Sequence, residues 1–551
     1  MGTRVITCGA GLCCGLSLAT QIFAYMMRLD PALGLPWWRH HFLAFYAPWG
    51  IIPWAWQWAP LAPRAFLLPT MAGLMCVVMT IVKAWPPPRT ETPKPQARWA
   101  TRRTLQANDI ATRPGAGPVL GQLGRHVLRA CGGQHLLIVA GTGTGKTVAI
   151  VRPTLLEYQR SMIIHDPKGG LYEWLLPDRR TMANTAGYRA RLGKVVLLAP
   201  LQDDTDGLNL WDMVRVGTDE EYRDVQMISH YLANPEGKVS QDETSQHFRD
   251  LVNLFMPGVF LYGLHTGLAT TGAAFNELVN GADWQDLLTV MQVSAHPIVR
   301  QAGILAGRPG DNERGSLQTS LARCLSLFND PRIARMTNHS TFCLADLREQ
   351  DRPCTVYLSV PFPEQERLRM LVVLFLRLML DHCVSRLTGW RHDLLFVGEE
   401  FPSLGRCDFI SHGLNHAREF GVSYCLITPS MEELIKVYGP HHNFLDGCRV
   451  QVSFGLTDPR VAETFSKSLG TRETHHHRVT TQRGGRRSMS EDVREEPLLN
   501  VTGLLDLEER AVLVKAGRHK RILQQARYYE HRVWRQRSQL PLPARQGVDH
   551  V

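Results

Sequence analysis

The chain has 551 residues, 44% of them hydrophobic and 20% charged, a length and composition that suit about three or four globular domains with cores of their own. Its net charge of +10 favours an anionic partner such as nucleic acid or lipid headgroups, although a basic surface is also common on solvated protein. The 12 cysteines include no C-x-x-C pair, which argues against a disulfide framework or a cysteine zinc site and fits a reducing compartment.

Two apolar segments near the N-terminus are predicted to form a transmembrane anchor, residues 1–85. Residues 5–27 and 65–82 are uncharged runs of 23 and 18 residues, long enough to cross a bilayer as helices. A cleaved signal peptide ending near Ala24 is the alternative for the first run. We predict two retained spans, because export would separate the nucleotide motif described below, at residues 141–147, from cytoplasmic ATP.

The segment between the spans, residues 28–64, is expected to be a loop on the outer face of the membrane. Prolines are expected to break any helix within residues 42–63, and the tryptophans there favour the membrane–water interface. These residues are Pro48, Pro53, Pro60 and Pro63, with Trp49, Trp54, Trp56 and Trp58.

Basic residues dominate after the second span. Lys83, Arg89, Lys94, Arg98, Arg102 and Arg103 stand against one acid, Glu91. By the positive-inside rule this side is cytoplasmic, so we predict a two-span protein of the bacterial inner membrane with Met1 and the bulk of the chain in the cytoplasm. Residues 86–120, which begin with three prolines, are predicted to be a semi-rigid linker.

A glycine-rich turn follows an apolar strand predicted at residues 135–140. Its sequence is Gly141-Thr142-Gly143-Thr144-Gly145-Lys146-Thr147, and it matches G-x-x-x-x-G-K-[ST] except that Ala140 stands at the first glycine. The glycines let backbone N–H groups surround phosphate oxygens, Lys146 brings positive charge to the β- and γ-phosphates, and the Thr147 hydroxyl ligates Mg²⁺. Residues 148–156 can form a helix whose N-terminus adds to the anion site. The pattern predicts that residues 141–147 bind ATP with Mg²⁺.

From residue 135 onward, short apolar runs alternate with helical patterns. The runs are residues 162–165, 195–198, 356–360, 394–397, 424–427, 450–454 and 512–514. This alternation predicts an α/β fold, with a mainly parallel sheet covered by helices on both faces. The alternation of strand and helix patterns is interrupted at residues 211–308. We predict an all-α domain there, inserted between two parts of the nucleotide-binding domain, residues 121–210 and 309–530; extra helices on the sheet are the alternative.

Two acids, Glu399 and Glu400, follow the apolar run at residues 394–397. At the end of a Walker B strand, Glu399 can hold Mg²⁺ directly or through water, and Glu400 can orient or deprotonate the attacking water. A loop with solvated acids is the alternative for this pair alone. The phosphate-binding loop upstream favours the nucleotide site.

Taken together, the motifs from about Gly121 to Glu530 resemble the coupling proteins of type IV secretion and bacterial conjugation, the TraG type. The residues that carry the resemblance are Gly141 to Thr147, His165 to Gly169, Arg314 to Arg332, Glu399 to Gly405, Tyr438-Gly439 and Tyr528-Tyr529. The resemblance implies a RecA-like P-loop ATPase that forms a homohexameric ring. It also implies delivery of a relaxase–DNA complex or of effector proteins to inner-membrane components of a type IV secretion channel. The inserted helices would receive the cargo.

Arg418 is similar in position to the family's candidate trans-acting arginine. In a ring, such a guanidinium reaches the γ-phosphate of the neighbouring subunit, which is worth ~10³-fold or more in rate where it operates. The resemblance therefore adds Arg418 to Lys146, Glu399 and Glu400 as a catalytic candidate. An arginine on a surface helix is the alternative.

Three positions depart from the family pattern. Glu399 stands for the usual Asp, Gly170 for a Glu, and Pro429 for a phosphate-sensing Gln. Glu399 and Pro429 keep open a second function, a nucleotide-binding substrate receptor with little hydrolysis. A separate alternative changes only the cargo: a coupling protein that carries effector proteins without DNA, in which the basic stretches contact lipid or partners.

Basic residues gather again near the C-terminus. A flexible stretch there either lines a DNA path through phosphate contacts or is a solvated loop. It contains Arg472, Arg478, Arg483, Arg486, Arg487 and the run His475-His476-His477. Three adjacent histidines cannot easily all face one ion, so we do not expect a metal site there. Residues 531–551 are predicted to be a basic tail that contacts a partner.

Overall fold

A computed structural model describes residues 2–40, 43–84, 96–176, 181–234, 243–281, 284–308, 310–481 and 487–544. The chain forms two compact units, Met1–Pro95 and Gln96–Val551. Predictions that concern residues 86–95, Arg483, Arg486 and Arg545 lie outside the described residues.

The first unit is built on two long apolar helices, α1 (Gly2–Met26) and α3 (Leu67–Ala84), which pack against each other. They meet at small residues, because a Cβ added to Gly15 would lie 2.7 Å from the carbonyl oxygen of Gly73. Close backbone approach at small residues is typical of helix pairs in membranes. Segments Gly9–Met26 and Pro63–Thr80 are long and apolar enough to cross a bilayer.

The segment between these helices is folded, and our expectation that prolines prevent any helix there is wrong. It contains η1 (Pro31–Leu33), the antiparallel pair β1 (Trp38–His40) and β2 (Leu43–Phe45), α2 (Ile51–Trp58) and η2 (Pro63–Phe66). Pro53 lies in the first turn of α2, where a backbone N–H has no partner within the helix. Trp54 and Phe66 stack on Phe23 of α1, with ring centroids 5.8 and 4.1 Å apart.

The second unit is organised around a 12-stranded sheet of order β10-β11-β7-β12-β13-β6-β14-β17-β18-β4-β5-β3. All neighbours from β10 to β14 are parallel, as predicted, and β17, β18, β4, β5 and β3 extend the sheet with antiparallel pairs. The parallel strands are β6 (Leu136–Val139), β7 (Ser161–Asp166), β10 (Lys194–Leu198), β11 (Cys354–Ser359), β12 (Leu394–Gly398), β13 (Val422–Thr428) and β14 (Val450–Ser453). The others are β3 (Ile110–Ala111), β4 (Val119–Leu123), β5 (His126–Ala130), β17 (Ala511–Ala516) and β18 (His519–Gln524).

Helices cover both faces of this sheet, so its central strands are buried on both sides. Along β12, Leu394 and Phe396 join one core, and Leu395 and Val397 join the other. The first core is covered by α14 (Gln365–Cys383), and the second by the π-helical turn η3 (Thr147–Val151) and α5 (Arg152–Leu155). Two further hairpin strands are β8 (Glu173–Leu175) and β9 (Met182–Asn184). The remaining helices of the sheet region are α6 (Ala186–Leu192), α15 (Asp408–His416), α16 (Met431–Tyr438), α17 (Phe444–Gly447), α18 (Pro459–Leu469) and α19 (Val501–Leu505), with short turns η6 (Leu344–Leu347), η7 (Phe362–Glu364), η8 (Phe401–Leu404) and η9 (Tyr528–Glu530).

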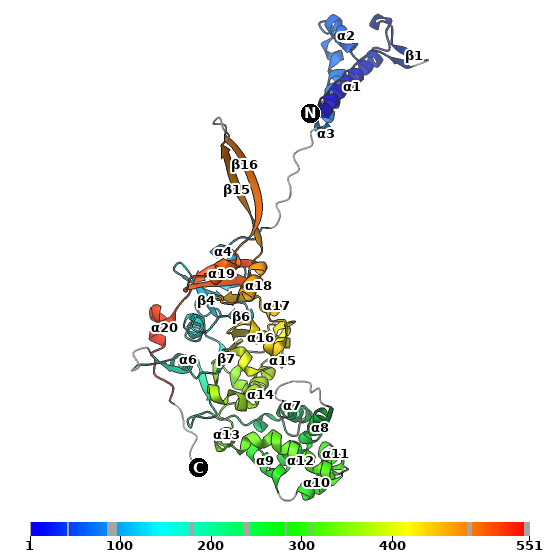
Figure 1. Ribbon diagram of the computed structural model, residues 1–551. Coiled ribbons are helices and arrows are strands. Elements are labelled where there is room, and N and C mark those ends of the chain that lie inside the picture. The colour runs from blue at the N-terminus through cyan, green and yellow to red at the C-terminus, as the bar shows by residue number, and fades with distance from the viewer. Residues whose placement is uncertain are drawn as a thin grey trace. The chain divides into compact units, whose positions relative to one another are not determined.

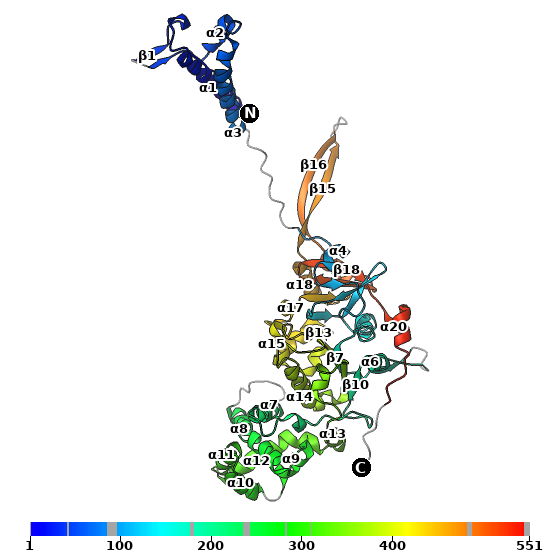
Figure 2. The same cartoon turned by 180° about the vertical axis from the view of Figure 1, so that it is seen from behind.

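A helical insertion separates β10 from β11, and its helices lie together beside the sheet (Figures 1 and 2). They are η4 (Trp211–Met213), α7 (Glu221–Ala233), α8 (Glu243–Thr266), α9 (Gly272–Asn280), α10 (Trp284–Gln292), α11 (Pro297–Gly307), α12 (Asp311–Leu325), η5 (Ser326–Asn329) and α13 (Pro331–Met336). The two ends of the insertion run side by side, since the Leu208 N–H donates to the Met336 carbonyl and the Thr341 N–H to the Gly207 carbonyl, each at 3.0 Å.

The expected end of the insertion at Arg308 is wrong. Helix α12 packs against α8 and α9 and buries Leu317, Leu321 and Leu325. The apolar stripe of α12 is narrow in an otherwise polar sequence, so its partners are visible only in three dimensions.

Three other segments that we expected to lack regular structure are folded. The predicted linker contains α4 (Arg102–Gln106) and, with β3 and the start of β4, adds to the sheet. The basic stretch forms an antiparallel ribbon, β15 (Thr471–Thr481) and β16 (Arg487–Pro497), in which Arg472 faces Glu496 (Figure 1). The expected tail contains α20 (Arg532–Arg537), whose Trp534 is only 3% exposed. The linker and the tail are held by distant segments, since the Ala100 N–H donates to the Lys520 carbonyl and Trp534 donates to Glu157, whereas the ribbon strands pair with each other.

Candidate functional site

The glycine-rich turn connects the carboxyl end of β6 to η3, and its backbone needs glycine at two positions. Gly143 and Gly145 have φ values of 80° and 92°, which side chains disfavour. The turn is held to the sheet because the Ala140 N–H donates to the Thr428 carbonyl of β13 at 3.0 Å. The loop therefore has the backbone shape that allows successive N–H groups to face an anion.

Lys146 folds back over this turn and is almost fully buried. Its Nζ donates to the Ala140 carbonyl at 3.3 Å, across the mouth of the loop. Burial lowers the pKa of Lys146, and the nearby acids Glu400 and Glu399 oppose that shift. A phosphate group bound in the loop would add negative charge beside this buried ammonium and favour its charged form.

Thr147 and Glu399 come together although they are 252 residues apart. The Thr147 hydroxyl donates to Oε1 of Glu399 at 2.5 Å, and Glu399 is 3% exposed at the end of β12. Burial raises the pKa of the Glu399 carboxyl. A hydroxyl and a carboxylate are hard oxygen ligands of the kind Mg²⁺ prefers, so this pair fits the metal of a nucleotide complex.

Glu400 adopts a left-handed backbone, with φ of 48° and ψ of 48°. Holding a residue other than glycine in this region costs about 1–3 kcal/mol, and such residues cluster at functional sites. The carboxylate pairs with Nζ of Lys168 at 2.5 Å. Glu400 also lines a cavity of about 600 Å³ together with Thr142 of the phosphate loop and Pro429.

The segment after β7 positions Lys168. The buried Asp166 carboxylate accepts backbone N–H groups from Lys168, Gly170, Leu171 and Tyr172 at 2.6 to 3.4 Å, which fixes the turn that carries Lys168. His165 lies next to it with Nδ1 3.0 Å from the Glu399 carbonyl oxygen. Burial lowers the pKa of His165 to about 4, so the ring is neutral near pH 7.

Gly170, where the family pattern has a Glu, lies at an open position. A Cβ added there meets no described atom within 4 Å. The Gly170 backbone nevertheless takes part in the site, since its carbonyl accepts from the Arg152 guanidinium at 3.2 Å.

The sequence motifs did not predict two residues near the loop, Gln525 and Arg152. Nε2 of Gln525, a buried side chain, donates to the Thr144 carbonyl at 2.9 Å and to the Glu509 carbonyl at 2.8 Å. Arg152 stacks on the Trp174 ring at 3.8 Å. Gln525 lies 381 residues from the loop, and neither residue belongs to a phosphate-binding pattern.

Arg418 is not near the phosphate loop of its own chain. A Cβ added to Gly133, before the amino end of β6, would lie 3.7 Å from Cγ of Arg418, whereas the loop leaves the carboxyl end of that strand. Arg418 lines a separate cavity of about 530 Å³ with Arg160 and Asp393. Of the four catalytic candidates, Lys146, Glu399 and Glu400 lie together, and Arg418 lies apart from them.

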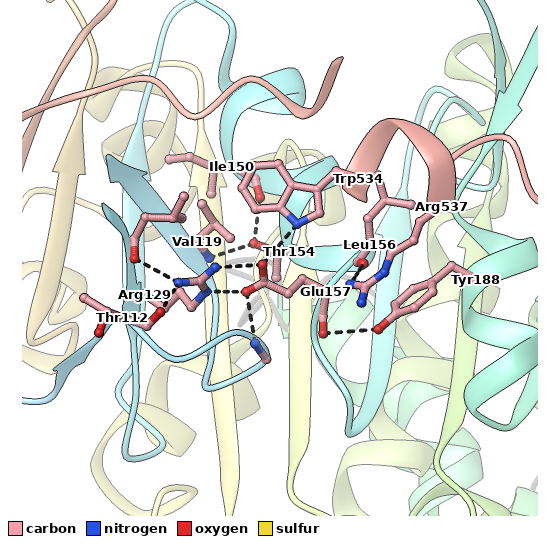
Figure 3. Close-up of polar contacts among 12 residues, drawn as sticks. Thr112, Val119, Arg129, Ile150, Thr154, Leu156, Glu157, Tyr188, Trp534 and Arg537 are labelled. Carbon is pink, nitrogen blue, oxygen red and sulfur yellow. Dashed lines mark hydrogen bonds and ion pairs between the residues drawn. The ribbon is translucent and has the colours of Figure 1, made fainter. Parts of the chain in front are cut away.

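The C-terminal helix α20 docks on the chain just after α5 (Figure 3). Nε1 of Trp534 donates to Oε2 of Glu157 at 3.0 Å, and the same carboxylate forms a buried ion pair with Arg129. Arg537 donates to the Leu156 carbonyl at 2.7 Å and lies over the Tyr188 ring at 4.3 Å. The helix that begins at the phosphate loop is thus clamped at its far end.

A phosphate-binding turn after β6 and a buried acid after β12, with β13 between these two parallel strands, define a RecA-like P-loop NTPase. Residues 96–548 match the family described as "Type IV secretory system Conjugative DNA transfer", and the chain belongs to this family. The family resemblance inferred from the sequence is therefore confirmed.

Known proteins agree with this assignment. The chain is 28% identical over 542 residues to the conjugal transfer protein TraG of Escherichia coli, with 88% of this chain and 82% of the relative covered. Its fold is similar to that of the bacterial conjugative coupling protein TrwBdeltaN70 in complex with sulphate, with TM-score 0.57, 18% identity and coverage of 83% of this chain and 96% of that one. The plasmid coupling protein TrwB in complex with ADP and Mg²⁺ gives TM-score 0.52 and 18% identity, covering 75% of this chain and 86% of that one.

Proposed function

We propose that this protein is a coupling ATPase of the bacterial inner membrane, which recruits substrates and delivers them to a type IV secretion channel. The observation that carries the proposal is the convergence of Lys146, Thr147 and Glu399 at one edge of the sheet, in a chain of the conjugative DNA transfer family. The relatives named as conjugal transfer and coupling proteins support the same role.

ATP with Mg²⁺ binds at residues 141–147 in this proposal. The backbone of Gly141 to Gly145 surrounds the phosphates, and Lys146 neutralises their charge. Thr147 and Glu399 hold Mg²⁺, which draws charge from the phosphate oxygens when it is bound. The complex of TrwB with ADP and Mg²⁺ supports this choice of ligands.

Hydrolysis is assigned to Glu400 and to Arg418 of a neighbouring subunit. Glu400 borders the cavity beside the loop, where it can orient water once it is released from Lys168. Because Arg418 lies at the opposite end of β6 from its own loop, its role requires a ring. We propose a homohexamer, in which each Arg418 completes the site next to it.

Helices α1 and α3 anchor the protein in this proposal, with the second unit in the cytoplasm. The close packing of Gly15 on Gly73 and the apolar composition of both helices support the anchor. The basic excess after residue 82 supports the orientation.

The cargo is proposed to be a relaxase–DNA complex, in keeping with the family's description. Effector proteins without DNA are the alternative cargo. DNA binding whose logarithm falls linearly with the logarithm of salt concentration supports DNA cargo, because phosphate contacts release counterions. Binding of purified effector with no salt-dependent DNA affinity supports the alternative.

One observation favours a second candidate function, a nucleotide-binding substrate receptor with little hydrolysis. Nζ of Lys168 forms an ion pair with the Glu400 carboxylate at 2.5 Å, which competes with water for that carboxylate. Pro429 lines the same cavity and has no side-chain hydrogen-bond donor. A slow enzyme would result if Glu400 stays paired after ATP binds.

Complementation tests the coupling function in cells. A strain that lacks the gene receives the wild type, Lys146→Ala, or Lys467→Ala, which removes an exposed lysine of α18. We expect wild type and Lys467→Ala to restore substrate transfer and Lys146→Ala to fail while still inserting in the membrane. Transfer restored by Lys146→Ala contradicts the assignment.

A further inference from the structure

Two histidines and one acid converge in the helical insertion, away from the nucleotide site. Glu221 is the first residue of α7, His265 lies in the last turn of α8, and His296 immediately precedes α11. Nε2 of His296 is 2.8 Å from Oε1 of Glu221, and Nε2 of His265 is 3.0 Å from Oε2. The potential ligand atoms of all three side chains lie within 4.8 Å of one another.

The two histidine–glutamate spacings are close to those of a tetrahedral metal site. Bonds of about 2.0–2.2 Å to imidazole nitrogen and carboxylate oxygen place neighbouring ligand atoms about 3.3 Å apart. The two histidine–glutamate contacts, 2.8 Å to Oε1 and 3.0 Å to Oε2, therefore need to widen by a few tenths of an ångström. The remaining separations lie within 4.8 Å, and the histidine side chains close any excess when an ion binds. The two imidazole rings lie 4.9 Å apart at a tilt of 42°, so both can face one ion.

The carboxylate is already held as a metal ligand needs to be. The Gly217 N–H donates to Oε2 of Glu221 at 2.8 Å, which orients the acid from outside the cluster.

The exposure of the three side chains suits entry of an ion. Glu221, His296 and His265 are 13%, 20% and 34% exposed, so one side of the cluster opens to solvent. Two neutral imidazoles and one carboxylate are a donor set typical of Zn²⁺ sites that keep a fourth position for water or another ligand.

We propose that Glu221, His265 and His296 bind one divalent ion of the zinc class, which ties α7, α8 and the start of α11 together. The ion has three protein ligands and one solvent-facing position. That position can accept a carboxylate or imidazole from a docked protein. This site uses no cysteine and is separate from the histidine run at residues 475–477.

Zinc binding by the full-length protein in detergent tests the proposal. The run His475-His476-His477 is replaced by Gln in every protein compared, so that its metal affinity does not contribute. After metal removal, Zn²⁺ is titrated in competition with a chromophoric chelator. We expect Glu221→Gln, His265→Gln and His296→Gln each to lower the Zn²⁺ affinity by about tenfold or more.

His230→Gln is the matched control, because it removes an exposed histidine of the same helix α7. This variant is expected to bind Zn²⁺ as the parent does. Zn²⁺ should also raise the melting temperature of the parent and of His230→Gln and leave that of the three site variants unchanged. Equal Zn²⁺ affinity in all five proteins, or no Zn²⁺ bound by the parent, overturns the proposal.

Discussion

The buried carboxylate of Glu157 gives a prediction whose size follows from its partners (Figure 3). It accepts from two of the three guanidinium nitrogens of Arg129, Nε and Nη2, from the Gly115 N–H at 3.0 Å and from Nε1 of Trp534 at 3.0 Å. Arg129 and Glu157 are only 5% and 4% exposed. Glu157→Gln keeps the shape of the side chain and removes its negative charge. It also places an amide NH₂ group opposite groups that are themselves hydrogen-bond donors.

We expect Glu157→Gln to lower the free energy of unfolding by about 3–5 kcal/mol, because Arg129 is left as an uncompensated buried charge. Trp534→Phe removes one hydrogen bond to a charged group and should cost about 1.5–3 kcal/mol. Glu220→Gln disturbs an exposed pair with Arg223 and should cost less than about 1 kcal/mol.

Urea unfolding of the full chain in detergent, followed by circular dichroism, measures the free energy of unfolding of the three variants and so their ranking. Limited proteolysis at low urea reports separately whether α20 detaches first in the Glu157 variant. A Glu157→Gln protein as stable as Glu220→Gln refutes the reasoning, since the carboxylate would then contribute no more than a surface charge.

Three further predictions concern the ring, the anchor and the insertion. Arg418→Ala should lower ATP turnover by ~10³-fold with nucleotide affinity unchanged. Mixing it with Lys146→Ala subunits should restore part of the rate, because each mixed interface can combine an intact Lys146 with an intact Arg418. No recovery in the mixture contradicts a trans role. In a background without other accessible cysteines, Trp56→Cys, at a side chain that is 90% exposed, should react with an impermeant thiol reagent on intact cells, and reaction only after lysis reverses the topology. Replacing residues 209–340 by a short Gly/Ser bridge should retain nucleotide binding and abolish cargo capture, because the flanking backbones already lie together; full cargo capture by this variant places recognition elsewhere.

Local patterns predicted the parts of the fold whose residues are adjacent in the sequence. The apolar runs of β7, β12 and β13 alternate with helices, and buried parallel strands read as continuous apolar segments. The glycine-rich turn also lies within seven residues, so residues 141–147 alone predict a phosphate-binding role. The meeting of Thr147 with Glu399 followed once both were placed at carboxyl ends of parallel strands.

What the sequence did not reveal depends on contacts between distant segments. Gln525, the residue after β18, donates a hydrogen bond to the loop, and the sequence around it contains no phosphate-binding pattern. Trp534 looked like part of a basic tail because the carboxylate that it contacts, Glu157, is far away in the chain. The C-terminal end of the insertion was predicted too early, at Arg308, because the pairing of Gly207 with Thr341 has no local signature.

The central claim is that the loop at residues 141–147 powers a coupling ATPase. The most direct measurement is steady-state ATP hydrolysis by the detergent-solubilised full chain, with Lys146→Ala as the test and Lys467→Ala as the control. The account predicts Mg²⁺-dependent turnover by the wild type and by Lys467→Ala, and none by Lys146→Ala, since only the Lys146 side chain brings a full positive charge into the loop. Equal turnover by wild type and Lys146→Ala, or no turnover by the wild type, would contradict it.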